Sequence, residues 1–212
     1  MRARAATYEP KEELLNVISH GAGLLMAITG LVLIVVNSSL YKTVWHIVSN
    51  SIYGSSLVLL YLASTVYHAS KHPVFRIKAN IIDHAMIYVL IAGTYTPFTL
   101  ITLQGPWGWS IFGVIWGLAI AGIIFKVFMA GRWDKVSTVA YVLMGWIAVI
   151  AIYPLVKNMA GWGLFWLGFG GLFYTLGAIF YLKKSLRFNH FIFHIFVLLG
   201  SISHYICIYF YV

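Results

Sequence analysis

The stretch NHFIFHIFVLLGSISHYICIYFYV, residues 189–212, contains no lysine, arginine, aspartate or glutamate. A helix needs about 20 mainly apolar residues to cross the hydrocarbon core of a membrane. The stretch is long enough to do so, and it begins with His190 and His194, which are four residues apart and therefore share one helix face. It predicts a transmembrane helix with a pair of imidazoles in its first two turns.

The rest of the chain repeats this apolar pattern. Hydrophobic types make up 61% of the 212 residues and charged types only 9%, whereas soluble domains are about 45–50% apolar and about 25% charged. We therefore predict an all-α polytopic membrane protein with a single domain, 1–212, in which 1–12 is a short cytoplasmic segment. The seven apolar runs lie at about 14–36, 44–68, 80–103, 107–130, 136–155, 162–182 and 188–211.

Lysine and arginine indicate the orientation of these spans. Twelve of the 14 basic residues fall in the N-terminal segment and in the loops after spans two, four and six, and only Lys42 and Lys157 fall on the other side. The positive-inside rule then places the N-terminus in the cytoplasm and the C-terminus outside. This reading also explains the net charge of +9 without a nucleic-acid partner. The twelve are Arg2, Arg4, Lys11, Lys71, Arg76, Lys78, Lys126, Arg132, Lys135, Lys183, Lys184 and Arg187.

Polar residues within the spans gather at one depth. Ionisable groups are costly in a membrane and mark functional sites by default. Spans one, two, three and seven each place such residues at the end predicted to be cytoplasmic, whereas His46 and His204 fall toward the outer side. The cytoplasmic set is Glu13, Asn16, His20, Ser64, His68, Asp83, His190 and His194.

This set is open to two interpretations. The histidines are either hydrogen-bonded groups near the membrane surface or ligands of a metal ion. Three imidazoles with a nearby carboxylate and hydroxyl match the requirements of a catalytic zinc site, in which three protein ligands leave a fourth position for water. The single cysteine, Cys207, excludes a cysteine-based metal cluster and an intramolecular disulfide.

Several motifs, in order across nearly the whole chain, resemble a known family. They are EELLNVISHGAG (12–23), LASTVYHAS (62–70), IIDHAMIYVLIAGTYTPF (81–98), GGLFYTLGAIFY (170–181) and NHFIFHIFVLLGSISH (189–204). With them the sequence resembles the hemolysin III branch of the progestin and adipoQ receptor family, which includes the adiponectin receptors. The short N-terminal segment and short outer loops fit a bacterial member and argue against a protein hormone as partner.

The resemblance implies roles for individual residues. It implies an intramembrane Zn²⁺ held by His68, His190 and His194, with Asp83 and Ser64 as catalytic residues. It further implies supporting roles for three residues of the first span, Glu13, Asn16 and His20.

Three functions follow as alternatives. The first is a zinc-dependent hydrolase of membrane lipids, with a ceramide-like amide as substrate, because the family's zinc constellation is similar to that of alkaline ceramidases. The second is a non-enzymatic membrane sensor or regulator with a structural zinc. The third is a cytolytic hemolysin. In each case we expect a multi-pass protein of the bacterial inner membrane.

Overall fold

Seven helices in the described part of the chain are long and apolar enough to cross a membrane. The computed structural model describes residues 7–129 and 133–212, so the predicted topogenic residues Arg2, Arg4 and Arg132 lie outside the described residues. The elements are α1 Pro10–Tyr41, α2 Val44–Ala69, α3 Pro73–Pro97 with its π-helical extension η1 Phe98–Leu103, α4 Gly105–Phe128, α5 Asp134–Gly145, the 3₁₀ helix η2 Trp146–Ala151, α6 Ile152–Asn158, α7 Gly161–Leu182 and α8 Asn189–Tyr211. The predicted all-α fold with seven spans is confirmed.

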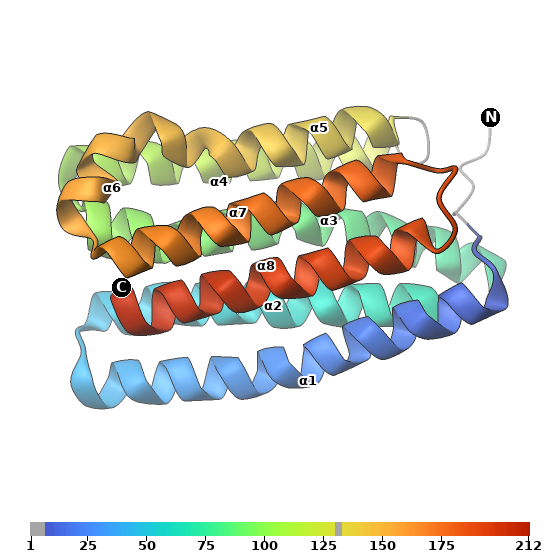
Figure 1. The fold of residues 1–212 in the computed structure, drawn as a ribbon, viewed down its shortest axis with the longest axis horizontal. Coiled ribbons are helices and arrows are strands. Elements are labelled where there is room, and N and C mark those ends of the chain that lie inside the picture. Colours follow the sequence, from blue (N-terminus) through green and yellow to red (C-terminus); the bar gives the residue numbers. More distant parts are fainter. Residues whose placement is uncertain (1–6, 130–132) are drawn as a thin grey trace.

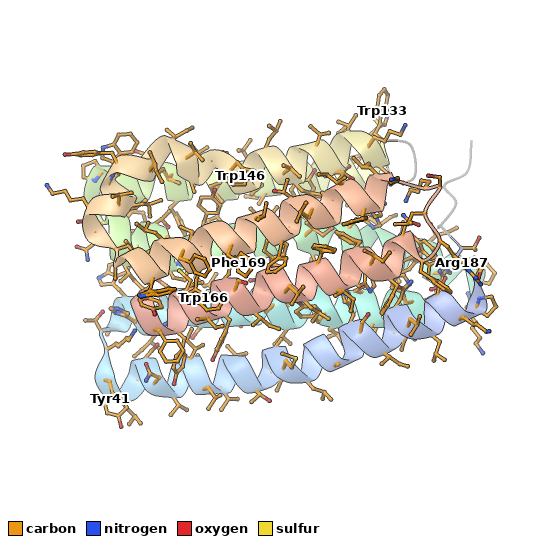
Figure 2. All side chains as sticks on the ribbon, viewed as in Figure 1. Tyr41, Trp133, Trp146, Trp166, Phe169 and Arg187 are labelled. Atoms are coloured by element: carbon orange, nitrogen blue, oxygen red, sulfur yellow. The ribbon has the colours of Figure 1, made fainter. Side chains whose placement is uncertain are left out.

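The helices run side by side along one long axis, with the start of α1 and the end of α8 at opposite ends of the bundle (Figure 1). Neighbours in the sequence pack together, and α8 also packs against α1 and brings the last span back to the first. The fifth span is the irregular one, because it is built from α5, η2 and α6 in succession. Large apolar side chains cover the outside of the bundle (Figure 2), as expected where the surroundings are lipid.

Two helices begin earlier than the apolar runs predict. α1 begins at Pro10 rather than near residue 14, and α3 begins at Pro73 rather than near residue 80. Proline is well suited to the first helical turn, because its missing N–H would have no partner there. In α3, the side chain of His72 also accepts a hydrogen bond from the N–H of Phe75 at 3.4 Å. The predicted segment 1–12 therefore includes the first turn of α1.

Close helix contacts surround the polar end of the bundle. A Cβ atom placed on Gly23 of α1 would come within 2.7 Å of the Tyr61 ring on α2 and 2.8 Å of Leu198 on α8. Only glycine allows these three helices to approach so closely. This contact holds α1 and α2 against α8 one turn from the predicted polar cluster.

Candidate metal centre

Three buried histidines from two helices form the centre of the polar cluster. His68 ends α2, while His190 and His194 lie on the first two turns of α8, and each is at least 96% buried. One ring nitrogen from each of the three lies within 4.8 Å of the others. The structure thus brings together the three residues that the resemblance implied as metal ligands.

The spacing of the ring nitrogens fits a metal ion. Nε2 of His68 lies 3.1 Å from Nε2 of His190. Two imidazole nitrogens bound to one tetrahedral zinc at about 2.0–2.1 Å would be separated by about 3.3 Å. Two buried nitrogens aimed at each other at this distance need either a shared proton or a shared cation, and imidazole suits ions such as zinc.

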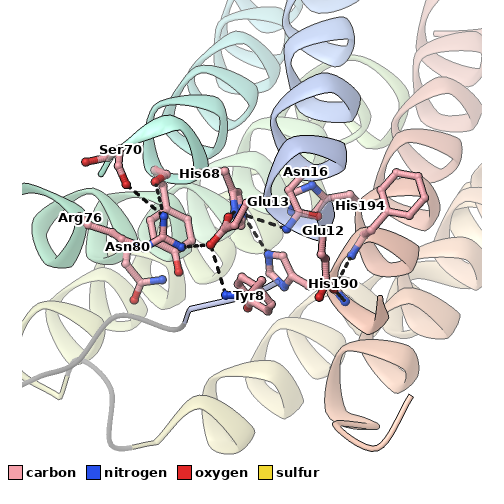
Figure 3. Close-up of polar contacts among 12 residues, drawn as sticks. Tyr8, Glu12, Glu13, Asn16, His68, Ser70, Arg76, Asn80, His190 and His194 are labelled. Carbon is pink, nitrogen blue, oxygen red and sulfur yellow. Dashed lines mark hydrogen bonds and ion pairs between the residues drawn. The ribbon is translucent and has the colours of Figure 1, made fainter. Parts of the chain in front are cut away.

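Hydrogen bonds on the far side of the rings orient two of the three histidines. The Glu13 carboxylate accepts a hydrogen bond from Nδ1 of His68 at 2.7 Å (Figure 3). Ser19 Oγ lies 3.3 Å from Nδ1 of His194. Because Ser19 donates its own proton to the Asn16 carbonyl, its oxygen accepts from His194. Both rings are therefore held with Nε2 free of a proton, the arrangement that metal-binding histidines usually show.

α1 also places His190 by capping the helix that carries it. The buried Glu12 carboxylate accepts hydrogen bonds from the backbone N–H groups of His190 at 3.0 Å and of Phe191 at 3.4 Å. The first N–H groups of a helix have no partner within it, and a carboxylate there also interacts favourably with the helix dipole. Glu12 was not predicted from the sequence, because nothing local shows that an acidic residue of one helix will cap another.

Tyr8, which lies just before α1, covers one side of the histidine cluster. The Tyr8 ring stacks on the His190 ring with centroids 4.5 Å apart and planes inclined by 22°. The Tyr8 N–H donates to Glu13 at 3.3 Å, and Glu13 also pairs with Arg76 of α3. Burial raises the pKa of the Tyr8 phenol far above its ordinary value, so the side chain stays neutral. Tyr8 and Arg76 are further residues of the site that sequence reasoning did not assign.

The other two predicted supporting residues, Asn16 and His20, also lie beside the three histidines. Asn16 is fully buried, with its Nδ2 3.5 Å from Nδ1 of His68. The His20 ring stacks on the His194 ring with centroids 3.5 Å apart and planes inclined by 11°. Neither ring nitrogen of His20 has a hydrogen-bond partner among the described residues.

Asp83 and Ser64 lie on the cavity side of the centre. Both are buried and line a cavity of about 300 Å³ that His190 and His194 also line. The Asp83 carboxylate pairs with its neighbour His84, whose Nδ1 lies 3.7 Å from Oδ2, and it also interacts with His68 and Ser64. Asp83 is not part of the three-histidine group that would share one ion, so its carboxylate remains available for chemistry beside that group.

The cavity is largely apolar and reaches the lipid face. Its walls come mainly from α3, the fifth span, α7 and α8, and they include His190, His194, Asp83 and Ser64. Trp146, Val149 and Ile152 line it and are also exposed on the outside of the bundle. The wall of the cavity therefore reaches the surface of the bundle at the irregular fifth span, on a face that an apolar molecule could approach from the membrane.

Comparisons with known proteins identify the family. A match to the haemolysin-III-related family covers residues 8–205. The chain belongs to this family. It is 48% identical over 202 residues to Hemolysin-3 of Bacillus cereus, covering 95% of this chain and 92% of that protein. It is 45% identical over 201 residues to the Hemolysin-3 homolog of Bacillus subtilis (strain 168), covering 95% and 94%.

A more distant relative extends the likeness beyond bacteria. The chain is 27% identical over 209 residues to the human monocyte to macrophage differentiation factor, covering 95% of this chain and 85% of that protein. The seven apolar helices and the haemolysin III family membership together make the chain a multi-pass integral protein of a bacterial membrane.

Proposed function

We propose that this haemolysin III family member is a zinc-dependent hydrolase that cleaves the amide bond of a ceramide-like membrane lipid. One observation carries the proposal: three buried histidines share a metal-sized space beside Asp83 and Ser64, on the wall of an apolar cavity that reaches the surface of the bundle. Such a site combines the donors for a metal, a candidate base and a space for an acyl chain.

The metal donors would be Nε2 of His68 and of His190, which lie 3.1 Å apart, together with Nε2 of His194, whose Nδ1 is engaged by Ser19. Zinc bound by three neutral imidazoles would make a bound water more acidic and polarise an acyl carbonyl. Glu13 holds His68 and Ser19 holds His194 in the orientation that this binding requires.

The remaining chemistry falls to Asp83 and Ser64. As general base, the Asp83 carboxylate would take the proton from the attacking water and pass it to the departing amine. The Ser64 hydroxyl lies beside the Asp83 carboxylate and would hydrogen-bond either that carboxylate or the negative charge that develops on the carbonyl oxygen. The apolar walls would hold the acyl chain and keep the bond to be cleaved beside these two residues.

A structural zinc in a sensor or regulator is the main competing function. A closed structural site has four protein ligands, and Asp83 or His20 would be the natural fourth. The three-histidine group includes neither residue, which favours an open position and hence the hydrolase. The name Hemolysin-3 of the Bacillus cereus relative raises cytolysis as a third function, but a largely apolar cavity is unsuited to conducting ions.

Metal content and turnover test the proposal together. Purified wild type should contain about one zinc ion per chain and release fatty acid from at least one member of a panel of amide and ester lipids. His194→Ala should lose both metal and turnover. Asp83→Asn should keep the metal while turnover falls about 10²- to 10⁴-fold. His46→Ala, at the opposite end of the bundle, is the matched control and should change neither.

Two results would contradict the proposal separately. Zinc-loaded wild type that hydrolyses no lipid of the panel would exclude the hydrolase while leaving the metal centre standing. A zinc content equal in wild type and His194→Ala would exclude the metal centre itself.

A further inference from the structure

His204 lies in the same cavity as the metal centre but far from it. It follows His194 on α8 by ten residues, which corresponds to about 15 Å along a helix that rises about 1.5 Å per residue. Both histidines line the cavity, and between them the walls are largely apolar. The cavity therefore has a polar group at each end of a long apolar middle.

The ring of His204 is fixed in one orientation. Its Nε2 donates a hydrogen bond to the Leu167 carbonyl of α7 at 3.0 Å, so in the neutral imidazole Nδ1 is an acceptor. A Cβ atom on Gly170 would overlap the imidazole, which shows that α7 leaves room for this ring and little more. At 9% exposure the side chain is nearly fully buried.

Nδ1 of His204 has no hydrogen-bond partner among the described residues. The polar groups near it are already engaged elsewhere. The Tyr174 hydroxyl shares a hydrogen bond with Ser201 at 2.8 Å, and the Cys207 thiol donates to the Gly163 carbonyl at 3.1 Å. A buried acceptor without a donor is costly. His204 lines the cavity, so a ligand that fills the cavity and reaches this side of the ring can supply the missing donor.

We propose that Nδ1 of His204 binds a hydroxyl group carried on the chain of a lipid that occupies the cavity. The inference rests on the proposed function, since it places the head of that lipid at the metal centre. An unsubstituted acyl chain would leave Nδ1 unpaired, whereas a chain with a hydroxyl about 15 Å from the head would satisfy it. The cavity would thus select mid-chain hydroxylated lipids, because a site built to bind a hydroxyl discriminates against the analogue that lacks it.

Binding of free fatty acids tests this selection without requiring turnover. The probes are stearic acid and a hydroxystearic acid with its hydroxyl near the middle of the chain, titrated into detergent-purified wild type while the fluorescence of the cavity residue Trp146 and its neighbours is followed. The mid-chain hydroxy acid should bind about tenfold more tightly than stearic acid. A hydroxy acid with its hydroxyl next to the carboxyl should show no such advantage, because that hydroxyl lies far from His204.

Two variants separate the two nitrogens of the ring. The amide of asparagine stands as far from the backbone as Nδ1, and that of glutamine stands as far as Nε2. His204→Gln therefore keeps a donor for the Leu167 carbonyl but has no acceptor at the position of Nδ1, so it should bind both acids equally. His204→Asn keeps the acceptor and loses the bond to Leu167, so it should retain the preference.

Equal binding of stearic acid and the mid-chain hydroxy acid to wild type would overturn the inference and mean that Nδ1 meets only water. A preference that is undiminished in His204→Gln would overturn it as well. Because the measurement is binding, absent hydrolysis would leave a positive result intact, and absent selection would leave the hydrolase intact. The wild-type comparison decides the question even where a variant does not fold.

Discussion

At the scale of single residues, α1 contributes none of the three histidines of the candidate metal centre but contacts the residues that carry all three. Glu13 accepts from His68, Ser19 accepts from His194, and Glu12 caps the helix start that carries His190. The three contacts come from less than three turns of one helix. The ligands on α2 and α8 therefore depend on the docking of α1.

Replacing Glu13 tests this dependence. Glu13→Gln keeps the size of the side chain but removes the negative charge that fixes the proton on Nδ1 of His68. Loss of such a partner typically weakens metal binding about 10- to 100-fold, and we expect a loss of this size. It is measured by competition for zinc with a chelator of known affinity.

The control for this substitution is Glu9→Gln. Glu9 is also acidic and lies four residues earlier, but it is exposed and pairs with the exposed Arg187 at 3.3 Å. Exposed ion pairs contribute little, so zinc affinity should stay as in wild type. Equal zinc affinity in Glu13→Gln and Glu9→Gln would show that Glu13 does not support His68.

The sequence predicted the residues of the site better than their contacts. Helix spacing and the charge bias were enough to place His68, Asp83 and His190 at one depth, because depth depends only on position along a helix. Which side chain meets which depends on how helices rotate and pack. For that reason the capping role of Glu12 and the stacking of Tyr8 on His190 appear only in the fold.

At the scale of elements, apolar runs predicted the spans but not their charged first turns. The first two turns of α1 and α3 contain Lys11, Glu13, Arg76 and Lys78, which a search for apolar residues excludes. The fifth span differs for another reason. Pro154 has no N–H and so cannot donate the usual helical hydrogen bond to the carbonyl four residues earlier. The residues before it, Trp146–Ala151, form a 3₁₀ helix instead of an α-helix.

The segment before α1 is an element whose role can be tested through Tyr8. Its ring covers His190, so removing it should open the metal centre to water. Tyr8→Ala should lose zinc to a water-soluble chelator severalfold faster than wild type, whereas Tyr8→Phe keeps the stacked ring and should lose it at the wild-type rate. The measurement is the rate of zinc transfer after mixing with excess chelator.

Two outcomes of this comparison would contradict the prediction for Tyr8. Identical release rates in Tyr8→Ala and Tyr8→Phe would mean that the stacked ring does not limit access. A faster rate in both would assign the effect to the hydroxyl rather than to coverage of His190.

At the scale of the whole molecule, the charge bias and the metal centre belong to the same end of the bundle. Arg187 and Trp133 lie at the end where the N-terminus is found, and Tyr41 lies at the other (Figure 2). The three histidines of the candidate metal centre start α8 and end α2, which places them at the end where α1 begins as well. The orientation of the chain in the membrane therefore decides which compartment supplies metal and water to the site.

The positive-inside rule predicts that this compartment is the cytoplasm, and single cysteines can test it. In a Cys207→Ser background, Ser185→Cys lies in the exposed loop between α7 and α8 at the metal end, and Asn158→Cys lies exposed at the opposite end. In intact cells a membrane-impermeant thiol reagent should label Asn158→Cys and leave Ser185→Cys unlabelled. After permeabilisation it should label both, which controls for reactivity. Labelling of Ser185→Cys alone in intact cells would invert the topology and place the metal centre at the outer face, where a cytoplasmic zinc supply could not reach it.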